Sequence, residues 1–369
     1  MRKSCIFDFY MSKLLQHPFS ETIIAWYSKN ARELPWRKTK DPYVIWLSEI
    51  ILQQTRVTQG LPYFHRLLEA FPTVLDLANA DEDYLFRLWQ GLGYYSRARN
   101  LHKTAKFVAE AGGKFPSTYA ELIKLPGIGP YTAAAIASFA FDEPKPVVDG
   151  NVFRILARYF GVEVDILHAS ARKTFTDLAD ELIPKNQPAI FNQAIMEFGS
   201  LQCSPSPNCP TCPLQFTCVA FSENRVQSLP VKSKKKSQKE RFFAYFIIEK
   251  NGKIWVRQRA SKDIWQGLWE FYLVEVPHFQ SFEEIMGKDP VLAELGKQSV
   301  ITTLVSPPTH LLSHQKIFCQ AWHVQVNDHF VIPENDQFRW IEPQDFTNLG
   351  KPVLILNLIT DNLELKNLF

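Results

Sequence analysis

The sequence has no long apolar run, little net charge and no internal repeat. A membrane-spanning helix needs about 20 consecutive apolar residues, and no stretch approaches that length, which argues against an integral membrane protein. The formal net charge of +3 permits nucleic-acid binding without predicting it, because the distribution of charge matters more than its sum. The composition is that of a globular protein, and 369 residues are enough for two domains with separate cores.

The amino-terminal residues resemble a secretion signal only weakly. Asp8 and Lys13 interrupt the apolar part, and no small-residue cleavage site follows. We therefore expect a cytoplasmic protein. The sequence is also poor in cysteine outside one cluster, since four of its six cysteines lie between Cys203 and Cys218. In a chain without a secretion signal, such a cluster favours metal binding over disulfides.

Helical periodicity runs through residues 20–220, and no segment there alternates as a strand would. The pattern predicts an all-α domain that spans residues 1–225. We expect its helices near residues 20–26, 43–52, 61–70, 73–79, 83–90, 96–111, 117–124, 131–140, 151–160, 170–182 and 187–200.

Residues 226–240 are rich in lysine and have almost no apolar residue, which is typical of a linker. The lysine side chains could lie along the phosphates of a nucleic acid. Alternatively, the segment could simply be a solvated tether. From residue 241 the pattern changes to strands, expected at 241–248, 253–259 and 268–274, and Asn251-Gly252 predicts a hairpin between the first two. With helices at 281–298 and 353–363, residues 241–369 form a predicted small α/β domain.

Glu49 lies in the stretch Tyr43–Leu52, which is apolar all round except for Ser48 and Glu49 itself. A helix without a polar face is normally buried, and a buried carboxylate is costly unless it is paired or protonated. Glu49 is therefore either a core residue paired with an arginine or an acid with a raised pKa that acts near neutral pH. The polar turn after it contains Gln54 and Thr55 and adds hydrogen-bonding side chains.

Gly127 and Gly129 lie in a glycine-rich turn, Leu125–Pro130, that precedes a helix of small residues. Glycine permits a tight turn and the close approach of another chain, and the N–H groups at the helix start can bind phosphate. The turn has the form of a helix-hairpin-helix, which grips a nucleic-acid backbone without reading bases; the alternative is a plain connection between helices.

Asp149 comes just before the predicted helix 151–160. A helix N-cap is a common role for aspartate, and an ionised aspartate there could also stabilise positive charge on a bound sugar. The two roles are compatible.

Cys203-x5-Cys209-x2-Cys212-x5-Cys218 provides four thiolates in one short segment. Four cysteine ligands suit an iron–sulfur cluster or zinc. Zinc ribbons usually contain two separate Cys-x2-Cys pairs, whereas this segment has only one, so we favour a [4Fe–4S] cluster, with zinc as the alternative.

The segment Gly91–Arg99 combines a flexible turn with tyrosines and arginines. Such a combination can insert between bases and contact phosphates. By itself it is more typical of a helix connection with buried tyrosines.

Taken together, these motifs resemble those of the adenine DNA glycosylases of the helix-hairpin-helix superfamily, which remove adenine mispaired with 8-oxoguanine. The resemblance extends from about residue 18 to the C-terminus. Its most specific pieces are Leu34–Arg37, Ser48-Glu49 with Leu52–Thr55, Gly91–Tyr95, Leu125–Gly129, Val148–Val152 and the cysteine segment.

The resemblance implies a role for each matching residue. Glu49 matches the general acid that protonates the leaving adenine, and Asp149 matches the carboxylate that stabilises the oxocarbenium-like sugar. Tyr131 stands where bifunctional glycosylase/lyase relatives have a Schiff-base lysine, so we expect hydrolysis without strand cleavage through an imine. Asn151 would help to order Asp149 and the water.

Other matching residues would contact the DNA. Three line the pocket for the extruded base, and three are inserted into the duplex around the lesion pair. The first set is Trp36, Arg37 and Glu197, and the second is Gln54, Leu92 and Tyr94. We expect a monomer that acts on duplex DNA with an adenine:8-oxoguanine mispair, with no membrane partner and with the nucleoid as its cellular site.

The C-terminal half resembles the Nudix-like lesion-recognition domain of the same family. It lacks the glutamate-rich Nudix box, so no pyrophosphate hydrolysis is expected. Ser313 and His314 match a Phe-Ser-His loop that approaches 8-oxoguanine, and an ordinary polar hairpin turn is the alternative. Two features depart from the family: Leu312 replaces an aromatic residue, and the first cysteine spacer has five residues instead of six.

Two other functions remain open at this stage. One is a bifunctional glycosylase/lyase for oxidised pyrimidines, which Tyr131 in place of lysine argues against. The other is a non-catalytic DNA-binding protein, which the presence of both Glu49 and Asp149 argues against.

Overall fold

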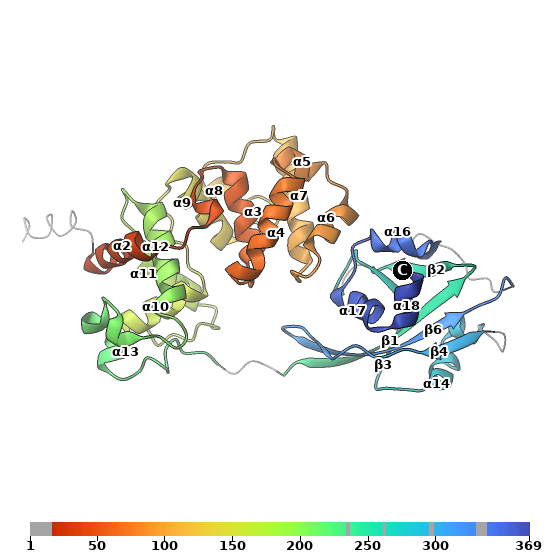
Figure 1. The fold of residues 1–369 in the computed structure, drawn as a ribbon. Coiled ribbons are helices and arrows are strands. Elements are labelled where there is room, and N and C mark those ends of the chain that lie inside the picture. The colour runs from red at the N-terminus through yellow and green to blue at the C-terminus, as the bar shows by residue number, and fades with distance from the viewer. Residues whose placement is uncertain (1–16, 234–236, 261–262, 295–298, 330–337) are drawn as a thin grey trace, which may run out of the picture. The chain divides into compact units, whose positions relative to one another are not determined.

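A computed structural model describes residues 17–233, 237–260, 263–294, 299–329 and 338–369. Contacts between residues divide the chain into two compact units that do not follow chain order (Figure 1). The first unit, here the helical unit, comprises Met1–Val57, Thr73–Ala78 and Lys103–Lys234. The second, here the sheet unit, comprises Thr58–Pro72, Asn79–His102 and Lys235–Phe369. The predicted linker, 226–240, includes residues 234–236, which lie outside the described residues.

The helical unit is built from helices throughout its described residues, in agreement with the periodicity of the sequence. Its main core is aromatic and centres on Phe19, Phe175, Phe191 and Phe198, all of them fully buried. The helices are α2 (Pro18–Asn30), α3 (Pro42–Leu52), α5 (Val74–Ala78), α8 (Tyr119–Leu122), α9 (Pro130–Phe141), α10 (Gly150–Phe160), α11 (Ala171–Leu182), α12 (Pro188–Leu201) and α13 (Val219–Ser222).

Helix α3 packs against α9, and this contact places the candidate site. Asp41 caps the start of α3 by accepting a hydrogen bond from the Tyr43 N–H, and Pro42 is its first residue. Five of the twelve residues of α9 are alanine, and the helix is buried from Ala133 to Ala137. Small side chains let the two helices approach closely, and α3 is buried almost along its whole length, as predicted from its lack of a polar face.

The sheet unit contains a seven-stranded mixed sheet in the order β4-β6-β1-β3-β2-β7, with β5 paired to β6. The long central strands β1 and β6 run parallel, and the other pairs are antiparallel. The strands are β1 (Lys239–Lys250), β2 (Lys253–Gln258), β3 (Trp269–Val276), β4 (Val300–Thr303), β5 (His310–Leu311), β6 (Gln315–Gln325) and β7 (Phe338–Ile341).

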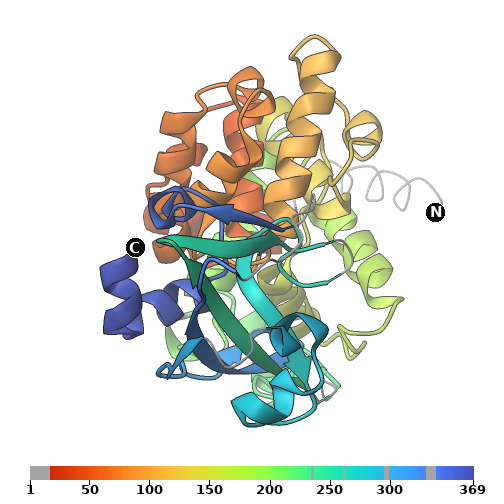
Figure 2. The same cartoon turned by 90° about the vertical axis from the view of Figure 1, so that its right-hand side faces the viewer.

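Helices cover both faces of this sheet (Figures 1 and 2). One face packs on α16 (Pro343–Thr347), α17 (Val353–Asp361) and α18 (Leu363–Leu368), through a core that includes Phe271 and Phe346. The other face packs on α14 (Phe282–Met286) and α15 (Pro290–Ala293), through a core that includes Trp255 and Trp322. Helices α4 (Val57–Ala70) and α6 (Glu82–Trp89) belong largely or wholly to the same unit, and α7 (Ser96–Glu110) continues from it into the helical unit.

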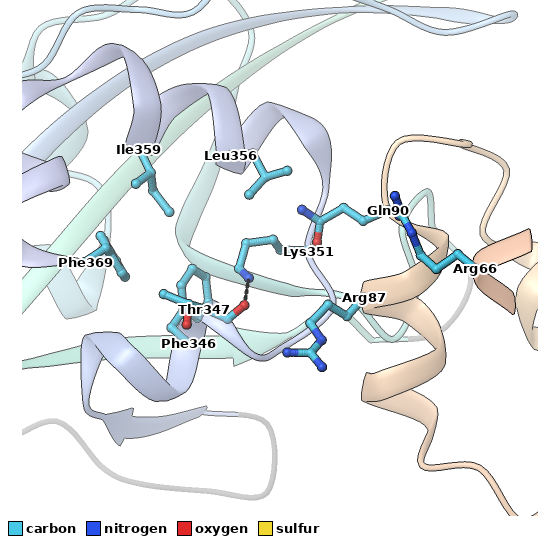
Figure 3. Close-up of a pocket in the computed structure, with 9 residues that line it drawn as sticks. All are labelled: Arg66, Arg87, Gln90, Phe346, Thr347, Lys351, Leu356, Ile359 and Phe369. Atoms are coloured by element: carbon cyan, nitrogen blue, oxygen red, sulfur yellow. Dashed lines mark hydrogen bonds between the residues drawn. The ribbon is translucent and has the colours of Figure 1, made fainter. Parts of the chain in front are cut away.

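Lys351 is a buried cation whose contacts stabilise the fold. Its Nζ donates a hydrogen bond to the carbonyl of Thr347 at 3.2 Å (Figure 3) and another to the carbonyl of Leu349 at 2.7 Å. Burial lowers its pKa to about 8. Lys351 lines a cavity of about 300 Å³ together with Arg66 and Arg87, but its ammonium group closes the last turn of α16, which accounts for its position.

The predicted fold class, an all-α domain followed by an α/β domain, is confirmed. The helix predicted over 281–298 was wrong in its extent, because α14 and α15 are separate and Pro290 begins the second. Strands β4 to β7 were not predicted. None of the described helices has the length and apolar character needed to cross a bilayer.

Candidate active site

Glu49 is a buried carboxyl group that accepts a side-chain hydrogen bond from a neutral donor. Its side chain lies in the third turn of α3, is 7% exposed, and accepts a hydrogen bond from the Tyr131 hydroxyl to Oε2 at 2.8 Å. Within the described ranges it forms no ion pair, so it is not a core glutamate paired with arginine. Burial raises its pKa to about 7; the charge of Asp149 adds to this shift, and the Tyr131 hydrogen bond and the charge of Arg37 oppose it.

Tyr131 is the second residue of α9 and faces both carboxyl groups. Burial raises its pKa well above the usual value, and the negative charges of Glu49 and Asp149 raise it further. The phenol therefore stays protonated at any physiological pH and keeps a proton to donate to Glu49 or to a bound ligand.

Asp149 is the N-cap of α10 and is held by three donors. Its Oδ1 accepts from the backbone N–H groups of Asn151, at 2.9 Å, and Val152, at 2.8 Å, and its Oδ2 accepts from Asn151 Nδ2 at 2.8 Å. Burial raises the pKa of Asp149, whereas these three hydrogen bonds and the charge of Arg154 lower it. The predicted cap is present, and the donors stabilise the ionised form.

Arg154, one helical turn after Asn151, connects this carboxylate to the cysteine segment. It donates to Asn151 Oδ1 at 2.8 Å and to the carbonyl of Cys203 at 2.7 Å. At Gly199, a Cβ atom would lie 2.8 Å from the Asn151 carbonyl oxygen, so only glycine lets α12 approach α10 here. Sequence reasoning missed Arg154, although its spacing of three residues from Asn151 could have indicated it.

Glu49 and Asp149 line the same cavity, which has a volume of about 580 Å³. This is within the range of ~300–1,000 Å³ that is usual for small-molecule sites. Tyr131, Gln54 and both glycines of the glycine-rich turn also line it. Thr55 is in the same polar turn as Gln54, and its hydroxyl donates to the Gln53 carbonyl at 3.4 Å.

The glycine-rich turn exposes its backbone at the mouth of this cavity. Gly127 has φ +77°, a left-handed conformation that favours glycine, and Gly129 is the N-cap of α9. Both are exposed, while Ile128 between them is buried and anchors the turn. The backbone N–H groups of these two glycines are therefore the candidates for binding an anion, since Pro130, the first residue of α9, has none.

Trp36, Arg37 and Glu197, predicted to line the base pocket, are not among the residues that line this cavity. Trp36 is buried in a short 3₁₀ turn, Pro35–Arg37. Glu197 is 1% exposed and accepts hydrogen bonds from Arg32 and from Arg37, with Arg37 Nη2 at 2.8 Å from Oε2. Burial alone would raise its pKa, but the two guanidinium groups lower it to about 2.

The four cysteines of the segment 203–218 all have free thiols and line one small cavity together with Arg158. Arg158 is 4% exposed and donates to Cys203 Sγ at 3.6 Å and to the carbonyls of Ser204, Pro205 and Leu229. It has no carboxylate partner among the described residues. A buried guanidinium is stabilised by a nearby negative charge, so a group of thiolates or an anionic cluster fits this position.

Leu92, Tyr94, Ser313 and His314 lie in the sheet unit and line a separate cavity of about 510 Å³. Tyr94 has φ +49° and is 42% exposed, whereas Leu92 is buried. Ser313 Oγ and His314 Nδ1 are 3.2 Å apart, and both side chains are exposed at the turn between β5 and β6. Four of the residues predicted to contact the duplex or the lesion, Leu92, Tyr94, Ser313 and His314, thus line one cavity, whereas Gln54 lines the cavity of the helical unit.

Comparisons with known proteins show which families the chain is similar to. Residues 47–181 match the family model of the HhH-GPD superfamily base excision DNA repair proteins, and residues 244–361 match that of the NUDIX domain. The chain is 32% identical over 350 residues to the adenine DNA glycosylase of Buchnera aphidicola subsp. Baizongia pistaciae, covering 93% of this chain and 96% of the relative.

A second relative and a solved structure are also similar. The adenine DNA glycosylase of Buchnera aphidicola subsp. Schizaphis graminum is 40% identical over 256 residues, covering 69% of this chain and 74% of the relative. The structure of a thermostable thymine-DNA glycosylase matches with a TM-score of 0.52 and 29% identity, covering 56% of this chain and 95% of that structure.

Proposed function

The chain belongs to the adenine DNA glycosylase family, and we propose that it removes adenine paired with 8-oxoguanine, or with guanine, by flipping the adenine out of the duplex. The family places it among DNA glycosylases, which hydrolyse N-glycosyl bonds in base excision repair. The preference for 8-oxoguanine and the flipped base belong to the proposal. The observation that carries it is the buried, unpaired carboxyl group of Glu49 on the same cavity as Asp149.

Glu49 provides the proton. With a pKa of about 7, a large fraction of its carboxyl groups is protonated at neutral pH, so it can donate to a ring nitrogen of the leaving adenine. The glycosidic bond breaks with its electron pair on the base, and the donated proton neutralises the charge that develops there. Tyr131 orients the carboxyl group through its hydroxyl.

Asp149 stabilises the sugar. As the bond breaks, positive charge develops on the deoxyribose, and an ionised carboxylate on the cavity wall opposes it. The three donors on Asp149 keep its charge in place and fix its orientation. Water then adds to the sugar carbon and returns a proton to the site.

Tyr131 makes the reaction monofunctional. A phenol cannot form the imine through which lysine-dependent relatives cleave the strand. Borohydride should therefore trap no covalent protein–DNA adduct, whereas a bifunctional glycosylase/lyase for oxidised pyrimidines would be trapped.

DNA would be gripped through the backbone of the glycine-rich turn. The exposed N–H groups around Gly127 and Gly129 can bind a phosphate near the cavity without reading sequence. Gln54, exposed just after α3 with φ +57°, would contact the duplex beside the flipped base. Ser313 and His314 would contact the 8-oxoguanine, where oxidation converts an acceptor on the imidazole edge into a donor.

The cysteine segment would hold a [4Fe–4S] cluster with Cys203, Cys209, Cys212 and Cys218 as ligands. The four thiols line one small cavity beside the buried Arg158 guanidinium, and the segment contains a single Cys-x2-Cys pair where zinc ribbons usually have two. A four-iron cluster binds each thiolate to a different iron and needs them around a larger centre. The purified protein should be brown; a colourless, zinc-loaded protein would contradict this assignment.

Glu49→Gln tests the proposed function directly. The amide keeps the size of the side chain but cannot donate a proton, so adenine release should fall by at least ~10²–10⁴-fold. Single-turnover assays on adenine:8-oxoguanine duplexes measure the rate, and gel-shift assays check that binding persists. Substantial turnover by this variant would refute the role of Glu49. The same duplex with guanine in place of 8-oxoguanine measures the preference for the lesion.

A further inference from the structure

The cavity of the sheet unit that Ser313 lines has a second wall, the turn Asp263–Gly267, here the tryptophan turn. Trp265 from this turn lines the cavity together with His310 and Leu312 from the loop that leads to Ser313. Both Trp265 and Leu312 also pack on the edge of the core between the sheet and α17. The indole ring is half-buried, so part of it belongs to the core and part faces the cavity.

Trp265 has an unusual backbone conformation. Its φ of +60° lies in the left-handed region, which a bulky residue rarely adopts. Such a conformation persists only where the surrounding structure determines it, and it is concentrated at ligand-binding and catalytic positions.

A buried charge network holds the tryptophan turn in this conformation. Asp263 accepts hydrogen bonds from Arg241, at 2.8 and 2.9 Å, and from Arg259. Arg259 also donates to the carbonyl of Ile264 at 3.0 Å and to Glu270, which is fully buried, at 2.7 Å. Both arginine side chains are less than a tenth exposed. The turn is thus tied to β1, β2 and β3 at once and cannot relax without breaking ion pairs.

The ring itself is fixed from two sides. It meets the Phe243 ring edge-on at 6.2 Å between centroids, and it meets the His310 ring at 5.4 Å and 71°. Its indole N–H has no hydrogen-bond partner among the described residues. The structure therefore presents a fixed aromatic surface to the cavity that Ser313 also lines.

We propose that Trp265 is a specificity-determining residue, whose ring packs against the oxidised purine that Ser313 hydrogen-bonds. This rests on the proposed preference for 8-oxoguanine. An aromatic side chain packed on a base contributes about 1–3 kcal/mol to binding, which corresponds to roughly 5- to 100-fold in affinity. A ring held in place before binding contributes this without the entropic cost of ordering it.

Three variants made in the Glu49→Gln background test the proposal through binding. Trp265→Leu removes the ring, and Trp265→Phe keeps a ring without the N–H group. Trp340→Leu is the matched control, because Trp340 lies on β7 and packs on the opposite face of the sheet. The measured quantity is the ratio of affinities for adenine:8-oxoguanine and adenine:guanine duplexes.

We expect Trp265→Leu to lower this ratio at least 5-fold, Trp265→Phe to stay within about 2-fold of the parent, and Trp340→Leu to leave it unchanged. An unchanged ratio in Trp265→Leu, or an equal loss in Trp265→Phe, would overturn the proposal. A parent protein with a ratio of one would instead contradict the proposed lesion preference itself, so the two failures are distinguishable.

A second measurement does not depend on the stability of the Leu variant. The protein labelled with 5-fluorotryptophan gives a ¹⁹F resonance for Trp265, assigned by its loss in Trp265→Phe. This resonance should shift when an adenine:8-oxoguanine duplex binds and should shift less with adenine:guanine. A resonance that both duplexes leave unmoved would overturn the proposal.

Discussion

Glu49 and Glu197 are both buried in the helical unit, yet their surroundings shift their pKa values in opposite directions. Burial acts to raise the pKa of each. At Glu49 one neutral phenol donates to the carboxyl group and the pKa rises to about 7. At Glu197 two guanidinium groups overcome the effect of burial and the pKa falls to about 2. The partner therefore decides whether a buried carboxyl group keeps its proton.

This difference in pKa gives the two glutamates different roles: Glu197 stabilises the fold, and Glu49 is the candidate acid. Glu197 is a permanent anion that ties α12 to the segment Arg32–Arg37, and it lies outside the cavity. Glu49 lines the cavity and exchanges a proton near neutral pH. Asp149 lines the same cavity as Glu49, and its pKa is subject to opposing influences: burial raises it, and three hydrogen-bond donors lower it.

After Glu49→Gln, the largest effect is expected at Asp149, which tests whether the two carboxyl groups of the cavity divide their roles. Asp149→Asn keeps a good N-cap but removes the charge that opposes the developing positive sugar. Adenine release should fall about 10²–10³-fold with the fold intact, as measured by single-turnover rates and circular dichroism. Asp81→Asn, which changes the N-cap of α6 away from the cavity, is the control. Equal rates of adenine release in Asp149→Asn and Asp81→Asn would show that Asp149 acts only as an N-cap.

The next prediction compares how much Glu197→Gln and Glu49→Gln lower the stability of the protein. Glu197→Gln leaves Arg37 and Arg32 without their partner, and we expect a loss of about 2–3 kcal/mol in the free energy of unfolding at pH 7. This is below the value for a fully buried pair because Arg32 is 36% exposed. Glu49→Gln breaks no ion pair and should cost much less. Urea denaturation measures both, and equal losses would contradict the comparison.

The pH dependence of that loss has a definite sign. The pKa of Glu197 is depressed from 4.5 to about 2, so its stabilising contribution is present above about pH 4.5 and is lost as the pH falls toward 2. The difference between Glu197→Gln and wild type should therefore shrink at pH 3. A difference that is constant between pH 3 and 7 would show that the ion pairs are not its source.

The smallest effect concerns Tyr131. Its hydrogen bond lowers the pKa of Glu49, so Tyr131→Phe should raise that pKa further. Activity that depends on the protonated acid then persists to higher pH, and the alkaline limb of the pH–rate profile should move upward by a fraction of a unit to about one unit. A downward shift would mean that Tyr131 stabilises the protonated form instead.

Much of the helical site could be predicted from local sequence. The burial of Glu49 followed from a helix with no polar face, and the cap at Asp149 followed from its place before α10. The partner of Glu49 could not be predicted from the pattern, because Tyr131 is 82 residues away and only the packing of α3 on α9 brings the two together. The ion pairs of Glu197, likewise, depend on residues 160 and 165 positions away.

The sheet unit was harder to predict. Strands β4 and β5 are short and largely exposed, so they have no alternating pattern to recognise. The conformation of Trp265 comes from a charge network spread over three strands, which no local motif encodes. The break between α14 and α15 was predictable, since proline at position 290 cannot continue a helix.

The most direct test of the account is the pKa of Glu49 in the folded protein. A ¹³C-carboxyl NMR titration of selectively labelled glutamate, with Glu49→Gln to assign the resonance, measures it without DNA. The account predicts a midpoint near pH 7 for Glu49, with Glu197 still ionised at pH 4. A midpoint near 4.5 for Glu49 would contradict it, because the carboxyl group would then hold no proton to give to adenine at neutral pH.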